Sequence, residues 1–331
     1  MSKSFVIRMV CKLTFSAMLA LCSVGTMAQV ASWPDRPIRL ILPYTPGSLT
    51  DTIARMLAER LTQRLGKPVI VENRAGATTI IGTEAVARAT PDGYTLFLGG
   101  SSTHTVGPNL IKSLPYDPIK DFAEVAYVGG IRSYLVVGGS SPYRTVADLL
   151  ASAKATPGKL NYAAVTPTAI LAAELFKLVT GTDFIQINYK SSPQAITDII
   201  GGQVHMGIVV PGDAAALIKS GQLRALAYTG LTRSEAFPQV ATFGELGFPE
   251  LQKIVGWFGL WYPAKTPQAI VERMNREVNA VLAQPDFVQK FVSFGVTLDG
   301  TGGTPEEFGK LIREDLVRWA RVVKEANIPR Q

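Results

Sequence analysis

Apolar and polar positions along the chain follow two recurring patterns. Short runs of branched aliphatic residues, as at 38–42, are typical of buried strands, whereas apolar residues that recur every three or four positions, as at 49–65, are typical of amphipathic helices. The alternation continues with expected strands at 69–71 and 94–98 on either side of an expected helix at 80–89. Strand–helix–strand order of this kind predicts a parallel α/β sheet with crossover helices.

A second set of alternating elements begins after the glycine pair at 129–130. Its expected strands cover 134–137, 160–165, 184–189, 205–210 and 223–228, and its expected helices cover 145–154, 168–179 and 193–200. An apolar run at 257–262 and helices at 267–283, 285–294 and 305–326 follow. Thr304 and Glu307 match a capping box at the start of the last helix. The two sets predict two lobes, each with its own α/β sheet.

The segment 1–28 has the composition of a secretory leader. Three basic residues and no acid precede an apolar run at 13–24, and small residues end at Ala28. The apolar run is too short for a membrane-spanning helix, which needs about 20 residues. We therefore expect a signal peptide that is cleaved after Ala28. A buried N-terminal helix and lipidation at Cys22 are the alternatives.

Composition and charge exclude several classes of function. The chain has 331 residues, of which 47% are hydrophobic and 18% charged, which is an ordinary globular balance for about two domains. The formal net charge of +7 comes partly from the leader, and no run of five like charges indicates a nucleic-acid partner. Cys11 and Cys22 both lie in the leader, and His104 and His205 are the only histidines. We therefore expect no disulfide, no metal site and no cofactor in the mature chain.

Three loops after predicted strands of the first lobe carry small and hydroxyl-bearing residues. In parallel α/β sheets, ligands bind beyond the carboxyl ends of the strands. The loop 43–51 contains Ser48 and Asp51 in capping-box spacing, at a helix start whose free N–H groups suit a carboxylate, although a plain helix cap also explains it. The loops 72–79 and 99–105 resemble it in composition. Three such loops in one lobe indicate a polar pocket for a small acid.

The second lobe offers fewer polar residues in its loops. Thr166 and Thr168 follow one predicted strand, and their hydroxyls can donate to a ligand oxygen. Asp213 follows another strand, where it either accepts from an amino or hydroxyl group of a ligand or caps the helix that begins near Ala214.

Catalytic motifs are absent from the sequence. No serine stands in a Gly-x-Ser-x-Gly elbow, and the phosphate-loop and dinucleotide fingerprints are missing. Ser101 or Ser102 with His104 is a poor match for a catalytic triad, because such near neighbours rarely reach its geometry. We expect no enzyme and no catalytic residue; a secreted serine hydrolase that uses these three residues is the alternative.

Several collinear motifs resemble one family of receptors. They read PYTPGSLTDTIAR, ENRAGATTIIGTEAVARATPDGYTL, LPYDPIKDF, GGQVHMGIVV, IKSGQLRALAYTG, GWFGLWYPAKTP and GGTPEEF. In order and over essentially all of the mature chain they are similar to the Bug family, the extracytoplasmic solute receptors of tripartite tricarboxylate transporters. The resemblance implies a receptor and no catalysis. A sensory protein that hands its ligand-bound state to a membrane signalling partner would share these features.

The resemblance also implies a fold and a set of partners. The fold is an α/β, two-lobed type II periplasmic-binding-protein fold with the ligand in the cleft between the lobes. Lobe 1 comprises 29–134 and 260–331, and lobe 2 comprises 135–259. The implied protein is a periplasmic monomer that captures a small mono- or dicarboxylate, aromatic acids included, and delivers it to membrane permease subunits.

The loops that bind the ligand in the family correspond to loops of this chain, and the resemblance implies which residues bind a ligand here. They are Tyr44, Thr45, Gly47, Ser48, Ala77, Thr78, Thr79, Ser101, Ser102 and Thr103 from lobe 1, and Thr166, Thr168 and Asp213 from lobe 2. Ser48 and Thr79 stand where the family usually has glycine, and 163–170 lacks the family's Gly- and Ser-rich character and its histidine. The acid-binding class transfers, because backbone N–H groups do not depend on side chains. We expect one carboxylate on the first lobe and an apolar or aromatic body toward Val165 and Ile170.

Overall fold

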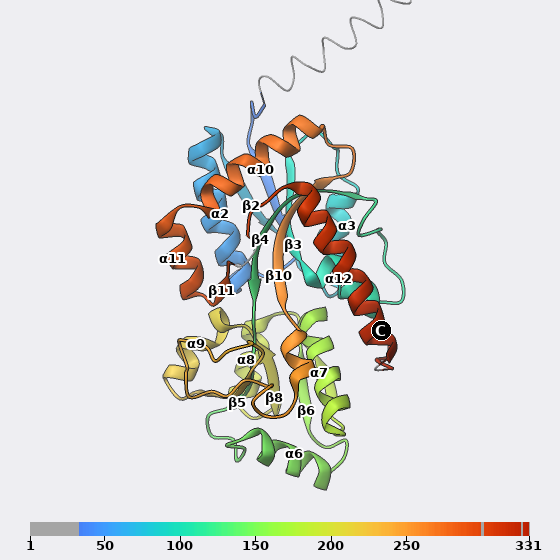
Figure 1. The fold of residues 1–331 in the computed structure, drawn as a ribbon, viewed down its shortest axis with the longest axis vertical. Helices are drawn as coiled ribbons and strands as arrows, with labels where there is room; N and C mark the ends of the chain where they lie inside the picture. Colours follow the sequence, from blue (N-terminus) through green and yellow to red (C-terminus); the bar gives the residue numbers. More distant parts are fainter. Residues whose placement is uncertain (1–32, 299–300, 326, 331) are drawn as a thin grey trace, which may run out of the picture.

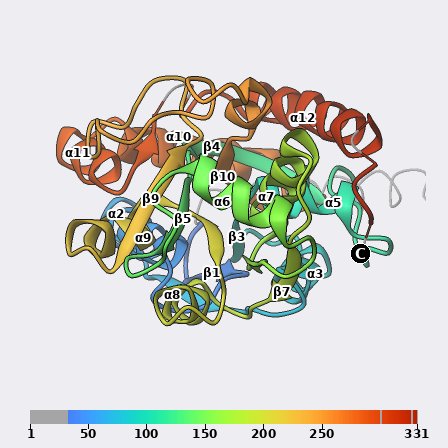
Figure 2. The same cartoon turned by 90° about the horizontal axis from the view of Figure 1, so that it is seen from below.

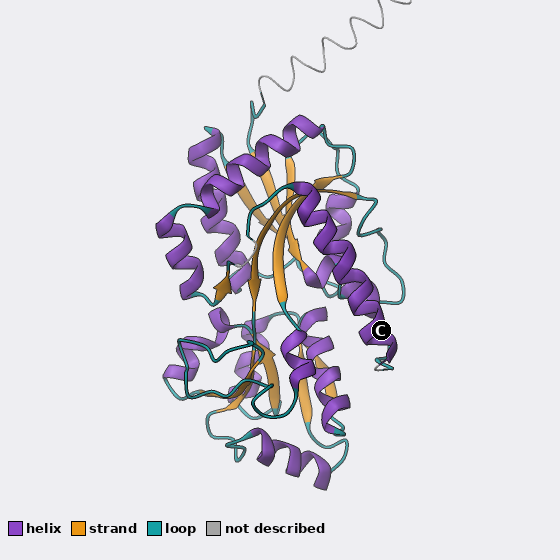
Figure 3. Cartoon of the chain, viewed as in Figure 1, coloured by secondary structure: helices purple, strands orange, loops and turns teal. Residues whose placement is uncertain are grey.

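The structure is a computed structural model that describes residues 33–298, 301–325 and 327–330. The signal peptide expected at 1–28 lies outside the described residues. Two α/β lobes are stacked along the long axis of the molecule (Figure 1), and each sheet is flanked by helices (Figure 3). In the described ranges, no helix combines the length and the apolar character needed to cross a membrane.

The first lobe is built on a six-stranded sheet with the order β11-β4-β10-β3-β1-β2. Its strands are β1 Ile38–Leu42, β2 Val69–Asn73, β3 Thr95–Gly100, β4 Phe122–Ile131, β10 Gly256–Pro263 and β11 Val296–Thr297. Strands β1, β2 and β3 are parallel, as predicted, but β10 is antiparallel to both β3 and β4. The predicted parallel arrangement therefore holds for β1, β2 and β3, and the complete sheet is mixed. β4 carries the chain to the second lobe and β10 brings it back, so the two strands run in opposite directions.

Strand β4 is the longest strand that the sequence pattern did not predict; β11, α4 and α5 were also not predicted. Its apolar run is interrupted by Glu124, and the glycine pair 129–130 marks a boundary by composition alone. The structure places both glycines inside the strand, where a Cβ atom on Gly129 would lie 2.7 Å from Val296 Cγ1. The missing side chains let β11 pair with β4, so these glycines serve a close approach between strands.

The second lobe is built on a five-stranded sheet with the order β7-β6-β8-β5-β9. Its strands are β5 Tyr134–Gly138, β6 Asn161–Ala164, β7 Ile185–Asn188, β8 Met206–Val209 and β9 Leu223–Tyr228. All five predicted strands are confirmed, and no end differs by more than one residue. β6 is parallel to β7 and β8, whereas β5 is antiparallel to β8 and β9.

Most helices lie where the apolar periodicity places them. Those of the first lobe are α2 Leu49–Leu65, α3 Ile80–Ala87, α4 Ser101–His104, α5 Gly107–Leu110, α10 Gln268–Leu282, α11 Pro285–Ser293 and α12 Pro305–Glu325. Those of the second are α6 Val146–Ala155, α7 Pro167–Thr180, α8 Ser192–Ile200, α9 Pro211–Lys219 and the 3-10 helix Pro249–Lys253. The capping box that opens α12 is confirmed: Thr304 N–H donates to Glu307 Oε2 over 2.8 Å, and Glu307 N–H donates to Thr304 Oγ1 over 3.2 Å.

The two sheets divide the chain between Ile131 and Tyr134, and again just before Gly256. The division into lobes at 134/135 and 259/260 stays a proposal. The lobes also share an apolar core, in which Leu110 of α5, Phe176 of α7 and Trp319 of α12 belong to one buried cluster. Figure 2 shows α5, α7 and α12 on the same side of the molecule. The C-terminal helix therefore contributes to the contact between the lobes.

Candidate functional site: a cavity between the lobes

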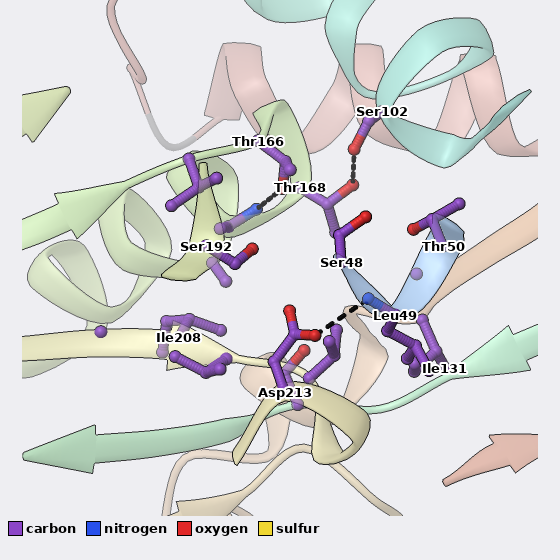
Figure 4. A pocket seen from close by; sticks show the side chains of 18 of the residues that line it. Ser48, Leu49, Thr50, Ser102, Ile131, Thr166, Thr168, Ser192, Ile208 and Asp213 are labelled. Carbon is purple, nitrogen blue, oxygen red and sulfur yellow. Dashed lines mark hydrogen bonds between the residues drawn. The ribbon is translucent and has the colours of Figure 1, made fainter. Parts of the chain in front are cut away.

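A cavity of about 110 Å³ lies between the two lobes and is lined by residues of both. The first turns of four helices form part of its wall. They are α2 with Ser48, Leu49 and Thr50, α7 with Thr166, Thr168 and Ala169, α8 with Ser192, and α9 with Val210 and Asp213 (Figure 4). The start of a helix carries a partial positive charge, so this wall favours an anion through the helix dipoles. Ser48, Thr166 and Ser191 each cap one N–H group at the starts of α2, α7 and α8.

Hydroxyl groups from both lobes meet in this cavity. Thr168 Oγ1 of α7 lies 2.9 Å from Ser102 Oγ of α4 (Figure 4). It also lies 3.0 Å from Ser101 Oγ of the same short helix. Burial raises the pKa of Tyr44 to about 12, against the opposing effect of its hydrogen bond with Ser102. The Tyr44 phenol is thus neutral and able to donate. Together these residues, which we call the hydroxyl cluster, offer several O–H donors to one carboxylate.

Asp213 connects the lobes on another side of the cavity. Its Oδ1 accepts a hydrogen bond of 3.0 Å from Leu49 N–H, in the first turn of α2 (Figure 4). Val210 is the N-cap residue of α9, and no side chain caps that helix. The interpretation of Asp213 as a cap of its own helix, α9, is therefore wrong. Its carboxylate accepts a hydrogen bond from the first turn of α2 in the opposite lobe. Burial raises the pKa of Asp213, although the hydrogen bonds from Leu49 N–H and Ser192 oppose the rise.

The loop before α2 is held by its own hydrogen bonds. Gly47 has a φ of +79°, and Ser48 Oγ accepts from Asp51 N–H over 3.3 Å. The second half of the expected capping box does not form. The Asp51 carboxylate accepts instead from Gly47 N–H over 3.0 Å, from Asn73 and from Arg55. The Gly47 N–H group therefore already has a hydrogen-bond acceptor within the loop.

The expected ligand-binding residues separate into two groups in this structure. Tyr44, Ser48, Ser101, Ser102, Thr166, Thr168 and Asp213 line the cavity. Thr45, Gly47, Ala77, Thr78, Thr79 and Thr103 are not among its lining residues as described. A role of either group in binding stays a prediction. Ser192 also lines the cavity but was not predicted as a pocket residue, although a hydroxyl in the first turn after β7 is the same signal that identified Thr168.

Ala77, Thr78 and Thr79 form a strained turn before α3. Their φ angles are 44°, 51° and 79°, all in the left-handed region that L-residues with side chains avoid. Thr79 is also buried, and its Oγ1 has no hydrogen-bond partner in the described residues. A branched side chain at this position therefore carries both backbone strain and an unsatisfied hydroxyl.

We predict that Thr79→Gly stabilises the protein. Relief of left-handed strain and removal of the buried hydroxyl together outweigh the extra entropy of a glycine in the unfolded chain, with a net gain of about 1 kcal/mol. Urea unfolding of the two proteins measures the difference. Thr52→Gly, in the regular interior of α2, is the matched control and should lose stability. An equal loss from both substitutions would contradict the strain argument.

His104 faces the protein core and not the cavity. Its ring stacks on Trp261 at a centroid distance of 3.8 Å, and its Nδ1 lies 2.8 Å from Thr103 Oγ1. Burial lowers the pKa of His104 to about 3, so the imidazole is neutral at physiological pH. Ser101 and Ser102 instead contact Thr168. This geometry gives no support to the serine-hydrolase alternative, because the base that it requires is turned away from both serines.

Comparison with known proteins identifies the family. Residues 53–328 match the model of the tripartite tricarboxylate transporter family receptor. The chain is 38% identical over 310 residues to Protein BugT of Bordetella pertussis, which covers 93% of this chain and 94% of BugT. It is also similar to the solved structure of R. palustris Rpa4515 with adipate (31% identity, TM-score 0.85, 90% of this chain and 99% of that chain). MatC of Rhodopseudomonas palustris with bound malate is a further match (26% identity, TM-score 0.83, 88% and 100%).

Fold and site define a two-lobed solute-binding protein with its cavity between the lobes. The chain belongs to the tripartite tricarboxylate transporter family of receptors. Receptors of this family bind solutes and are not enzymes, and a periplasmic location is consistent with this membership. In the described part of the chain, no group of three or more His, Cys, Asp or Glu side chains is placed to hold a metal ion.

Proposed function

We propose that this protein is a periplasmic receptor that captures a small organic carboxylate between its lobes and delivers it to a membrane permease. The observation that carries the proposal is the set of four helix starts that line the cavity, on α2, α7, α8 and α9. The dipoles of these helices favour an anion in the cavity without a cationic side chain. Asp213 already binds Leu49 N–H at the start of α2, so the ligand anion is expected nearer to the start of α7. The adipate and malate of the two similar structures agree with this class of ligand.

The polar and apolar parts of the wall indicate how the ligand lies. The hydroxyl cluster supplies donors for one carboxylate. The second lobe adds apolar side chains, among them Val165, Ile196 and Ile208. Burial of an apolar ligand body against them contributes about 25 cal/mol per Å². We therefore propose an acid with one carboxylate at the hydroxyl cluster and an apolar or aromatic body toward the second lobe.

We further propose that the chain is exported with a signal peptide cleaved after Ala28 and acts as a monomer. Intact mass of periplasmic material should correspond to a chain that begins at Gln29. A mature chain that begins at a lipidated Cys22 would overturn the cleavage site but not the receptor function.

A screen of carboxylates tests the proposed function. Aliphatic and aromatic mono- and dicarboxylates, with citrate as the tricarboxylate, are added singly, and the melting temperature is recorded. At least one acid should raise the melting temperature and bind at one site by calorimetry, without being converted. Its amide or methyl ester, which lacks the anionic group, is the control. Equal binding of acid and ester, or no binding of any acid, would contradict the proposal.

We predict that Thr168→Val weakens binding of the acid found in this screen by about tenfold to a hundredfold. Valine has nearly the same shape but removes the hydroxyl that lies between Ser101 and Ser102. Hydrogen bonds to a charged group contribute about 1.5–3 kcal/mol. Calorimetry of both proteins measures the change. Thr197→Val, on the exposed side of α8, is the control and should bind as the parent does. An unchanged affinity in Thr168→Val would remove the hydroxyl cluster from the site.

A further inference from the structure

The charged lining of the cavity is negative, although the ligand proposed for it is an acid. Among its described lining residues, Asp213 is the one charged side chain, and no Lys, Arg or His is present. No basic nitrogen of the described residues lies within 4 Å of the Asp213 carboxylate, so it has no salt-bridge partner. Asp213 is half-buried. A carboxylate that is partly removed from water without a cation is costly, and a ligand cation would offset that cost.

Asp213 also has acceptor capacity left for a ligand. An ionised carboxylate offers about four lone-pair positions. Leu49 N–H occupies one of them over 3.0 Å, and Ser192 donates to another. In Figure 4 the Asp213 carboxylate points toward the centre of the site, between α9 and the start of α2. A donor on the ligand can therefore reach it from the cavity.

The hydrogen bond between Leu49 N–H and Asp213 also excludes one binding position for the carboxylate of the ligand. Leu49 N–H belongs to the first turn of α2, the helix start where an anion would otherwise be held. Asp213 already occupies that position as an internal anion. The carboxylate of the ligand is left with the hydroxyl cluster around Thr168. The two ends of the site thus differ in chemistry: one presents O–H donors and the other a negative acceptor.

We propose that Asp213 makes this receptor selective for carboxylic acids that carry a protonated amine, and that it excludes a second carboxylate. This inference rests on the proposed function, because it assumes that an acid binds in the cavity. The amine donates to Asp213 and supplies the missing cation. A second carboxylate at that position would face a like charge in a buried site. The burial that raises the pKa of Asp213 is consistent with a carboxylate that lacks a positive partner.

Matched ligands test the selectivity by calorimetry at neutral pH. The first series keeps one spacer and varies the terminal group: 4-aminobutanoate, 4-hydroxybutanoate, pentanoate and glutarate. It is repeated with shorter and longer spacers, because the span of the site sets the best length. A second series compares leucine with its hydroxy analogue and with 4-methylpentanoate. In at least one series, the amine should bind about tenfold or more tightly than its hydroxyl and methyl analogues, and the dicarboxylate more weakly still.

Asp213→Asn separates charge from shape. Asparagine keeps an oxygen that accepts from Leu49 N–H, so the contact between the lobes can persist. The preference for the amine should disappear, and the dicarboxylate should bind more tightly than in the parent. Asp183→Asn, at an exposed position of the second lobe, is the control and should leave both unchanged.

The outcomes distinguish this proposal from the proposed function. If plain monocarboxylates or dicarboxylates bind as tightly as the amines in every series, Asp213 does not select and only this inference falls. An amine preference that survives in Asp213→Asn would overturn it as well. If no acid with or without an amine binds, the proposed function fails and this inference fails with it.

Discussion

Replacement of Asp315 by alanine is expected to lower the free energy of unfolding by about 3–5 kcal/mol. Asp315 is a buried carboxylate on α12. Its Oδ2 accepts from Trp257 Nε1 over 2.9 Å, Trp319 Nε1 over 3.0 Å and Thr105 Oγ1 over 3.0 Å, and Arg318 pairs with Oδ1. Alanine would leave these buried donors without a partner, and each unsatisfied group costs about 1–3 kcal/mol. Urea denaturation of both proteins measures the loss.

The other half of the ion pair provides the control. The Arg318 side chain is half exposed, so Arg318→Ala should cost no more than about 1 kcal/mol. Asp315→Asn retains an acceptor oxygen and should lie between the two alanine variants. Because Trp257 also lines the cavity, binding of the screened acid should weaken in Asp315→Ala. A loss below about 1 kcal/mol in that variant would contradict the role of the carboxylate as the common acceptor of these donors.

The stability of the protein should fall in acid because of His104. Burial lowers the pKa of this group to about 3 in the folded state, whereas in the unfolded chain it is about 6.5. Above pH 6.5 both states are neutral and the contribution is complete. As the pH falls below 6.5, His104 binds a proton in the unfolded state but not in the folded state. The free energy of unfolding therefore falls by about 1.4 kcal/mol per pH unit. Between pH 7 and pH 4.5 the expected loss from His104 is about 2–3 kcal/mol.

His104→Phe isolates this effect from the other titrating groups. Phenylalanine keeps an aromatic ring against Trp261 and Phe122 but cannot bind a proton. Urea unfolding of both proteins at a series of pH values measures the difference between them. The parent should lose its stability relative to the variant as the pH falls. Parallel curves would mean that His104 is not buried in its neutral form.

Much of the fold could be predicted because it is encoded locally. The strands of the second lobe and the long helices follow from apolar periodicity, which depends on neighbouring residues. β4 could not be predicted from local sequence. Gly129 is required there because Val296, more than a hundred residues away in the sequence, leaves no room for a side chain. The antiparallel direction of β10 likewise depends on the path of the chain between the lobes.

The candidate site shows the same division. The loops after β1 and β3 and the threonines near α7 were predicted as pocket residues because helix starts after strands have a recognisable composition. Their partners were not predicted. Thr168 contacts Ser101 and Ser102 across the cleft, and the buried ring of His104 faces away from them. Tertiary packing decides which residues of a short helix such as α4 face the cavity. The spacing of residues in the sequence does not predict this orientation.

The sequence by itself indicated the class of this protein, a two-lobed α/β receptor of the tripartite tricarboxylate transporter family, which the family match confirms. Apolar periodicity predicted the two α/β lobes, whereas the receptor class came from the resemblance of several collinear motifs to that family. Only the tertiary structure decided that Asp213 serves the first turn of α2 and not its own helix. That choice brings together residues 164 positions apart. The contact depends on how the sheets of the two lobes are placed relative to each other. A local sequence pattern does not predict that placement.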